Sequence, residues 1–287
     1  MKRILLVGHD GQVGGELLRT LAPLGELTAL CYPDVDFADP DSIRRTIRNA
    51  RPDILVNAAA YTAVDKAESE PELCRRINSG APAILAQEAQ RTGALLVHYS
   101  TDFVFDGAKR SPYTEDDPPR PLSVYGQTKL EGDRAIQASG APHLIFRTAW
   151  VYGRRGRNFL LTVRQLAEQG KPVRIVSDQI GCPTWSRVIA ETTAQALARV
   201  TGPLAILTPR EASGLYNLVC GGETSWHGFA RAFLPPETNV TAIAAAEYPT
   251  PARRPAYSAL DCSKLRHVFG LELPSWQDAL RRCLAEG

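Results

Sequence analysis

The chain has 287 residues, which is enough for one large domain or two closely joined domains with a sizeable core. Its 33 basic and 31 acidic residues nearly cancel, so charge gives no reason to expect nucleic acid or an anionic membrane as a partner. No apolar run approaches the roughly 20 residues of a membrane span, and Met1-Lys2-Arg3 leads directly into a strand-like run, so no signal peptide is expected. The six cysteines include no Cys-x-x-Cys pair, which favours reduced thiols and a cytoplasmic protein.

The first element is a short apolar strand over 3–7, and a glycine-rich turn follows it. Gly8, Gly11 and Gly14 lie in this turn, and an amphipathic helical pattern over 16–21 comes next. Glycines permit a tight turn and let main-chain N–H groups approach a pyrophosphate at the start of a helix. Glycines also simply terminate strands, but the strand–turn–helix context here favours dinucleotide binding.

Short apolar runs then alternate with helical patterns. Strands are predicted over 27–30, 54–57, 94–99 and 143–147, and helices over 41–50, 71–92 and 124–139. This alternation predicts a Rossmann-type α/β fold, a doubly wound parallel sheet with ligands at the carboxyl ends of its strands. His98 lies inside an apolar strand-like run, which favours a structural role over a catalytic one.

The pattern loosens after about residue 150. Residues 158–169 and 186–200 have helical patterns, residues 173–176 resemble a strand, and Pro-rich loops stand at 234–236 and 249–255. We therefore expect a dinucleotide-binding domain over 1–152, to which segments near 173–200 return. Residues 153–287 are expected to form mainly a smaller substrate-binding lobe.

Tyr125 and Lys129 are four residues apart, so they lie one turn apart on the same face of the predicted helix. A free phenol has a pKa of about 10, and a neighbouring ammonium group favours its ionised form. Such a tyrosine can give a proton to a carbonyl oxygen while a hydride reaches the carbon. The spacing alone also occurs by chance on solvated helices, and only the glycine turn and the strand-end segments make catalysis the better interpretation.

Seven blocks of the sequence together resemble the extended short-chain dehydrogenase/reductases and, within them, the family of dTDP-4-dehydrorhamnose reductases. The glycine turn and the Tyr/Lys pair are typical of the broad superfamily, whereas the Ala-Val-Asp-Lys-Ala-Glu, Asp-Gln-x-Gly-x-Pro-Thr and Arg-Pro segments are narrower. The matching blocks span residues 8–14, 57–68, 100–107, 125–129, 147–152, 178–184 and 251–255.

The resemblance implies reduction of the C4 ketone of dTDP-4-dehydro-L-rhamnose by NADPH or NADH, the last step in making dTDP-L-rhamnose. It implies that Tyr125 donates the proton, that Lys129 binds the nicotinamide ribose and lowers the pKa of Tyr125, and that Thr101 polarises the ketone. The cofactor supplies the hydride. Besides Tyr125 and Lys129, the implied cofactor-binding residues are Gly8, Gly11, Gln12, Val13, Gly14, Asp36, Phe37, Ala58, Ala59 and Ala60.

The resemblance also implies contacts with a dTDP-sugar, and each has a plainer alternative. Arg254 would grip the diphosphate with its guanidinium, or it is a surface charge near prolines. Trp150 would pack against the sugar ring, or it belongs to the core. Asp102 would position the sugar, or it caps a turn. Thr101, expected to be catalytic, is alternatively an ordinary hydroxyl at the end of a strand. The implied substrate-binding residues are Thr62, Val64, Asp102, Trp150, Asn158, Gln179 and Arg254, of which Asn158 and Gln179 are the weaker candidates because amides are common on loops.

Two positions of the sequence differ from what related proteins carry, one in the cofactor site and one where some of them bind a metal. Cys31-Tyr32-Pro33 follows the second strand, where NAD-specific sites carry an acid for the ribose 2′-hydroxyl. We therefore expect use of both cofactors with a lean to NADPH. Some family members hold a divalent ion at a dimer interface. Glu16 occupies a matching place here, but Arg187 stands where acids would be wanted, so no metal is predicted; a homodimer is compatible with the resemblance.

Two alternative functions stay open from the sequence. One is a related reductase or epimerase acting on another nucleotide-4-ketosugar, since loops that the sequence does not position decide the substrate. The other is a non-catalytic regulatory subunit of a methionine adenosyltransferase, which shares this fold. Retention of Thr101, Tyr125 and Lys129 together disfavours the second, because a binding subunit needs no proton chemistry.

Overall fold

The computed structural model describes residues 1–203 and 205–286, and its centre is a six-stranded sheet. All neighbouring strands are parallel, and their order across the sheet is β10-β5-β4-β3-β1-β2. The predicted Rossmann-type α/β fold is therefore confirmed. The bounds are β1 Lys2–Val7, β2 Gly25–Leu30, β3 Ile54–Asn57, β4 Leu95–Thr101, β5 His143–Thr148 and β10 Gly214–Asn217.

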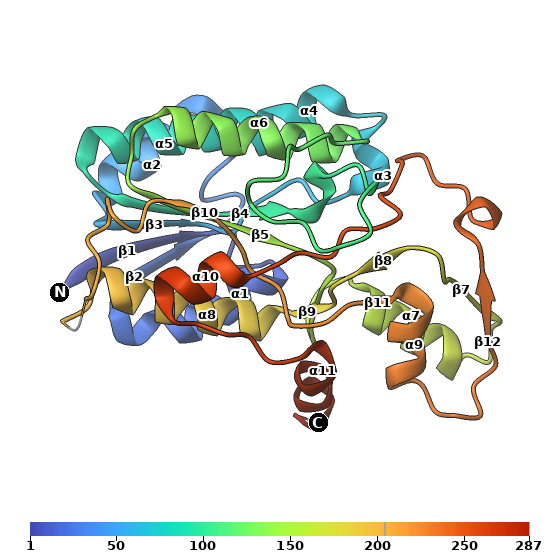
Figure 1. Ribbon diagram of the computed structural model, residues 1–287. Coiled ribbons are helices and arrows are strands. Elements are labelled where there is room, and N and C mark those ends of the chain that lie inside the picture. The colour runs from blue at the N-terminus through green and yellow to red at the C-terminus, as the bar shows by residue number, and fades with distance from the viewer. Residues whose placement is uncertain (204, 287) are drawn as a thin grey trace.

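Helices cover both faces of this sheet (Figure 1). On one face lie α2 (Pro40–Ala50), α5 (Ala81–Thr92) and α6 (Val124–Ala138), and on the other lie α1 (Gln12–Leu21), α8 (Ser186–Thr201) and α10 (Ser263–Phe269). Strand residues alternate between the two faces, so Ile4 and Leu6 pack in one buried cluster and Leu5 and Val7 in the other. Each face of the sheet thus has its own apolar core.

The helix predicted over 71–92 is divided by a π-helical turn. It comprises α4 (Pro71–Arg75), the π segment Arg76–Gly80 and then α5. Within the turn, Asn78 accepts a hydrogen bond from the Tyr61 N–H (2.8 Å) and donates one to the Tyr61 carbonyl oxygen (3.0 Å). The irregular turn therefore fixes the loop that follows β3, near the sheet edge where ligands are expected.

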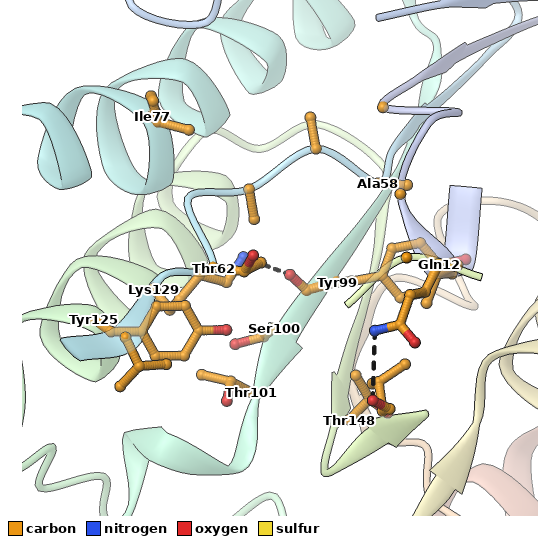
Figure 2. Close-up of a pocket in the computed structure, with 18 of the residues that line it drawn as sticks. Gln12, Ala58, Thr62, Ile77, Tyr99, Ser100, Thr101, Tyr125, Lys129 and Thr148 are labelled. Carbon is orange, nitrogen blue, oxygen red and sulfur yellow. Dashed lines mark hydrogen bonds between the residues drawn. The ribbon is translucent and has the colours of Figure 1, made fainter. Parts of the chain in front are cut away.

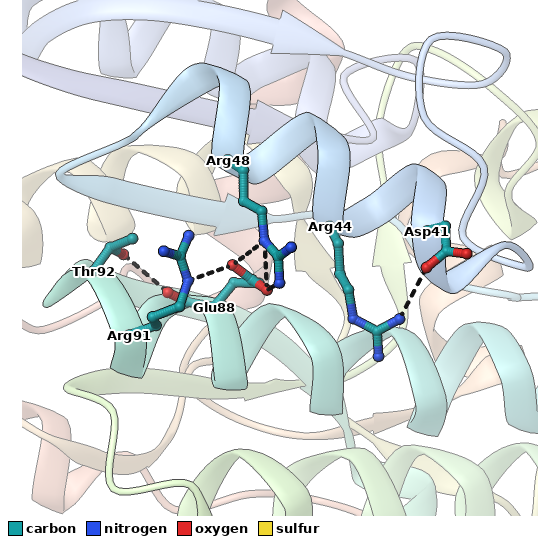
Figure 3. A network of polar contacts seen from close by, with 6 residues as sticks. All are labelled: Asp41, Arg44, Arg48, Glu88, Arg91 and Thr92. Atoms are coloured by element: carbon teal, nitrogen blue, oxygen red, sulfur yellow. Dashed lines mark hydrogen bonds and ion pairs between the residues drawn. The ribbon is translucent and has the colours of Figure 1, made fainter.

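Glu88 links α2 and α5 on the outer layer (Figure 3). Its buried carboxylate accepts hydrogen bonds from Arg48 at 2.5–3.1 Å and from Arg91 at 2.9 Å. Arg48, the largest cause, and Arg91 hold the pKa of Glu88 below its usual value. The network fixes the two helices without contacting the ligand side of the sheet.

A smaller lobe lies beside the sheet (Figure 1). Its core contains apolar residues of α7 and α9 and of two paired strands, β7 and β12, which do not join the large sheet. The strand predicted near 173 thus belongs to this lobe, whereas α8 packs along α1 on the large sheet.

The remaining elements are α3 Val64–Ala67, β6 Val151–Tyr152, α7 Phe159–Glu168, β7 Val173–Val176, β8 Ile180–Gly181, β9 Thr184–Trp185, β11 Thr224–Ser225, α9 Trp226–Phe233, β12 Val240–Ile243 and α11 Trp276–Ala285, with short helical turns at Ala22–Leu24, Asp102–Val104 and Ala245–Glu247.

No helix in the described part of the chain is long and apolar enough to cross a membrane. Its six cysteines are all free thiols.

Candidate active site

A pocket of about 850 Å³ opens at the carboxyl ends of the sheet strands, where the doubly wound topology predicts a ligand. It collects most of the residues singled out from the sequence, although they come from many separate segments. Those lining it are Gly8, Gly11, Gln12, Val13, Asp36, Phe37, Ala58, Ala59, Ala60, Thr62, Val64, Thr101, Asp102, Tyr125, Lys129 and Trp150.

The glycine turn is packed so closely that side chains are excluded from two of its positions. Gly8 has φ +84°, and a Cβ there would lie 2.5 Å from the Ala59 nitrogen; a Cβ on Gly14 would lie 2.0 Å from the Gly8 carbonyl oxygen. Gly14 therefore lies behind the pocket wall and permits the close approach of α1 to β1. No side chain caps the N-terminus of α1, and Gly11, Gln12 and Val13 at the start of this helix line the pocket. This arrangement suits the pyrophosphate of a dinucleotide.

The side chains expected to carry the proton chemistry converge at the end of β4. Ser123 caps α6 by accepting a hydrogen bond from the Gly126 N–H (3.2 Å), which starts the helix just before Tyr125. Tyr125 and Lys129 then project from α6 toward Ser100 and Thr101 (Figure 2). The geometry joins a phenol, a hydroxyl and an amine in one wall of the pocket.

Burial dominates the ionisation of these groups. It raises the pKa of Tyr125 above its ordinary value, although a hydrogen bond with Thr101 opposes that shift. It lowers the pKa of Lys129 to about 8, despite the nearby Asp133 carboxylate. The protein alone therefore does not lower the pKa of the phenol.

Thr101 and Asp102 are held by local hydrogen bonds. The Thr101 hydroxyl accepts one from the Phe103 N–H (3.1 Å) and donates one to Asp102 Oδ1 (3.1 Å). Burial raises the pKa of Asp102 to about 7, against hydrogen bonds from Ser258 and Thr101. Asp102 is thus a buried carboxyl that changes charge near neutral pH.

Trp150 stands at the border between the sheet and the smaller lobe. Its backbone is left-handed, with φ +45°, and its indole stacks on that of Trp226 in α9 with ring centroids 3.5 Å apart. Unusual backbone conformations in non-glycine residues persist where surrounding contacts hold them. Both indoles line the pocket, so the smaller lobe contributes an aromatic wall.

Three of the predicted substrate-binding residues lie outside the pocket lining. Asn158 caps α7 through the Leu161 N–H and donates hydrogen bonds to Gln12 Oε1 and the Gly153 carbonyl (both 2.9 Å). Gln179 lies on the loop before β8. Arg254 is engaged by the carboxylate of Asp65, with Nη1–Oδ1 and Nη2–Oδ2 distances of 3.0 and 2.8 Å.

Several pocket residues were not predicted from the sequence, and two of them, Trp226 and Arg157, bear on ligand binding. Trp226 carried no recognisable signal, because only the packing of α9 brings it to Trp150. Arg157 lines the pocket, and the preceding Gly156 lies close to the Gln12 side chain. The basic run Arg154-Arg155-Gly156-Arg157 after a short strand was an available signal for Arg157.

Glu16, the residue considered for a metal, instead forms an ion pair with Arg187 (3.0 Å). Among the described residues, no group of three or more His, Cys, Asp or Glu side chains is close enough to hold a metal ion.

Known proteins resemble this chain over its whole length. Residues 1–287 match the family model described as the RmlD substrate binding domain. The chain is 44% identical over 295 residues to a dTDP-4-dehydrorhamnose reductase of Burkholderia thailandensis, covering 99% of this chain and 98% of the relative. It is 45% identical over 296 residues to that of Escherichia coli, covering 99% and 97%.

A solved structure has the same architecture. The dTDP-4-dehydrorhamnose reductase of Bacillus anthracis, determined in complex with NADP, superimposes with a TM-score of 0.91 at 30% identity, covering 100% of this chain and 99% of the other.

Proposed function

The chain belongs to the RmlD substrate binding domain family, and on that premise we propose that it reduces the C4 ketone of dTDP-4-dehydro-L-rhamnose to dTDP-L-rhamnose. It is an NAD(P)H-dependent oxidoreductase, and this reaction is the last step of dTDP-L-rhamnose synthesis. The observation that carries the proposal is the convergence of Thr101, Tyr125 and Lys129 beside the glycine turn, in a chain that matches curated reductases along its full length.

The cofactor supplies the hydride when bound. Tyr125 gives its proton to the C4 oxygen. The single hydroxyl proton of Thr101 turns from Asp102 Oδ1 and donates a hydrogen bond to the same oxygen as negative charge develops there. Lys129 holds the nicotinamide ribose and favours the ionised phenol that remains. A subunit that only bound nucleotides would need none of this proton chemistry, which supports the reductase over a regulatory subunit.

Cofactor binding is assigned to the glycine turn, to Asp36 and Phe37 for the adenine side, and to Ala58, Ala59 and Ala60. We add Arg157 as a cation for the cofactor pyrophosphate, because it lines the pocket and the preceding Gly156 lies close to Gln12, the first residue of α1. Phosphate recognition by guanidinium groups is favoured by their paired donors.

The sugar nucleotide is assigned to the side of the pocket formed by Thr62, Val64, Asp102 and Trp150. Asn158, Gln179 and Arg254 stay in the proposal, with Arg254 as the grip on the diphosphate once its ion pair with Asp65 opens. We also propose a cytoplasmic location, supported by six free thiols, and a homodimer without nucleic acid as partner, supported by the family resemblance.

The decisive experiment is a reduction assay with the purified chain. We expect NADPH to be oxidised only when dTDP-4-dehydro-L-rhamnose is added, with dTDP-L-rhamnose as the product. The Tyr125→Phe variant should bind NADPH normally and turn over about 10²–10⁴-fold more slowly, the usual contribution of a positioned acid. Turnover of that variant within tenfold of the wild type would refute the assignment, and a faster reaction on another 4-ketosugar nucleotide would favour the related reductase or epimerase.

A further inference from the structure

Three buried polar side chains form a row behind the pocket, and the reaction proposed above uses only the last of them. Asn57 ends β3, His98 lies within β4 and Lys129 lies on α6. Asn57 Nδ2 is 3.0 Å from His98 Nδ1, and His98 Nε2 is 3.2 Å from Lys129 Nζ. Each residue is at most 2% exposed, so water does not satisfy these groups.

The orientation of the Asn57 amide is determined by the backbone. The Ala59 N–H donates a hydrogen bond to Asn57 Oδ1 at 3.1 Å. A backbone N–H only donates, so the amide atom that it faces has to be the oxygen. The amide NH₂ of Asn57 therefore faces His98.

This orientation determines where the imidazole carries its proton. Because the Asn57 NH₂ donates, His98 Nδ1 has to accept, and a neutral imidazole that accepts at Nδ1 carries its proton on Nε2. A doubly protonated ring is disfavoured for the same reason, and burial, the largest cause, lowers the pKa of His98 well below its ordinary value. The Nε2–H group then points at Lys129 Nζ.

Lys129, which faces this N–H group, is either an ammonium group or a neutral amine. An ammonium group has three donors and no acceptor, so it would place one N–H against another. A neutral amine has a lone pair that accepts from His98 Nε2–H, and it still donates to the Tyr99 carbonyl oxygen at 2.6 Å. The geometry favours the neutral amine.

The other groups around Lys129 act in both directions. On α6, Asp133 favours the ammonium, but its Oδ2 accepts from Ser100 (2.6 Å) and lies 3.7 Å from Arg147 Nε on β5, which shares its charge. Cys74 on α4 favours the ammonium when ionised, and burial raises the pKa of that thiol.

Tyr125, on the same helix, is held un-ionised by burial in the protein alone. Of the groups that favour the ammonium, Asp133 is thus shared with Arg147 and Ser100, and the Cys74 thiol is kept un-ionised by burial.

We propose that Asn57 and His98 act together as positioning residues for Lys129: Asn57 holds the imidazole proton on Nε2, and that N–H group favours the neutral amine over the ammonium. Resting on the proposed function, one consequence follows for the cofactor. Lys129 takes up a proton from solvent when it becomes the cation beside the nicotinamide ribose, so cofactor binding above neutral pH consumes protons.

The first test is the tautomer of His98 in the cofactor-free wild-type protein, measured by ¹⁵N NMR of the imidazole nitrogens, with His98→Gln identifying its signals. We expect Nε2 protonated and Nδ1 bare from pH 6 to pH 9. Protonation of Nδ1 at any point of this range would overturn the proposal. No substrate or turnover is involved, so failure of the proposed function would leave this result unaffected.

The second test reverses the tautomer. Asn57→Asp places a carboxylate that accepts from Nδ1–H and leaves the Nε2 lone pair facing Lys129, which accommodates the ammonium. The ¹³C signal of Lys129 Cε, identified with Lys129→Met, should titrate at least one pH unit higher than in the wild type. The same substitution in the His98→Gln background controls for the added charge and should shift it clearly less. Equal shifts in the two backgrounds would show that charge alone acts and would refute the role of His98.

Calorimetry of NADPH binding at pH 8, in buffers of different ionisation enthalpy, completes the test. We expect proton uptake by the wild type and less uptake by Asn57→Asp. Equal uptake by both proteins would contradict the consequence drawn for the cofactor.

Discussion

At the scale of single residues, Asp102 shows how a pocket side chain lowers the stability of its own fold. It is 2% exposed, and burial raises its pKa to about 7. An unfolded aspartate titrates near pH 3.9, so the folded protein binds the extra proton between these values. Below about pH 4 Asp102 is protonated in both states and its burial costs no ionisation energy. As the pH rises through 7, the folded protein has to hold a buried carboxylate, and this lowers the free energy of unfolding.

We predict that Asp102→Asn raises the free energy of unfolding at pH 8 by roughly 2–4 kcal/mol, since each pKa unit corresponds to about 1.4 kcal/mol. The gain should shrink toward zero as the pH falls to 4. Urea denaturation of both proteins across this range measures it.

Asp106→Asn is the matched control four positions along the chain. Hydrogen bonds from the Ala108 N–H and from Tyr113 keep the pKa of Asp106 below its usual value. This variant should therefore be less stable than the wild type at pH 8, and a gain in stability from both substitutions would contradict the argument for Asp102.

Cys31 is the second residue whose substitution tests the site. It lines the pocket just after β2, where NAD-specific proteins carry an acid for the ribose 2′-hydroxyl. We predict that the wild type uses NADPH and NADH with kcat/KM values within about 100-fold of each other, because one phosphate adds only a few charge-assisted hydrogen bonds. Cys31→Asp should lower the NADPH value at least tenfold more than the NADH value.

Steady-state kinetics with both cofactors measure this ratio, and Cys31→Asn separates charge from shape. Strict dependence of the wild type on NADH, or an equal effect of the Asp and Asn substitutions, would count against this interpretation.

At the scale of helices and strands, the Glu88 network makes a prediction independent of the pocket. Its carboxylate is nearly buried, whereas Arg48 and Arg91 are about half exposed, so solvent screens part of the attraction. We predict that Glu88→Gln destabilises the protein by about 1 kcal/mol at pH 7. The stability from the lowered pKa of Glu88 is fully present above the unfolded value of about 4.3. The loss should therefore diminish as the pH falls from there through the lower pKa of the folded protein.

Denaturation midpoints at pH 7 and pH 4 measure this effect. Glu72→Gln removes a similar ion pair with Arg75 whose carboxylate is 77% exposed, and it should change the midpoint little. Equal effects of the two substitutions would show that burial of Glu88 is unimportant.

The elements also show which parts of the fold the sequence predicts. Strands such as Ile54–Asn57 and helices such as Val124–Ala138 carry strong local patterns, and their positions were predicted within one or two residues. Strand β10 at Gly214–Asn217 was missed, because its four residues become a strand only through pairing with β5. β7 was recognised but its partner was not, since β12 lies far along the chain.

The site follows the same rule. Residues at the ends of parallel strands, such as Gly8, Ala58 and Thr101, were predicted together because the topology brings those ends to one edge. Trp226 and Arg157 were not, since loops and helix packing place them. The pairing of Arg254 with Asp65 depends on how the 249–255 loop meets α3, which lies far away in the sequence.

At the scale of the whole molecule, the pocket lies between the large sheet and the smaller lobe. The guanidinium groups of Arg157 and Arg254 lie at different places around it. Arg157 lines the pocket and follows Gly156, which lies close to Gln12 at the start of α1. Arg254 lies at the junction of the 249–255 loop with α3, where Asp65 engages it. If each binds the phosphates of a different ligand, their substitutions should have reciprocal effects.

We predict that Arg254→Ala weakens binding of dTDP about 10–150-fold and changes NADPH affinity less than threefold, because a hydrogen bond to a charged group contributes about 1.5–3 kcal/mol. Arg157→Ala should show the reverse pattern. Separate titrations of dTDP and NADPH against each variant measure both effects. Asp65→Asn is the control: it removes the partner of Arg254 but leaves the guanidinium, so dTDP should bind at least as tightly as to the wild type. If Asp65→Asn weakens dTDP binding as much as Arg254→Ala does, the ion pair itself supports the site and Arg254 does not grip the diphosphate.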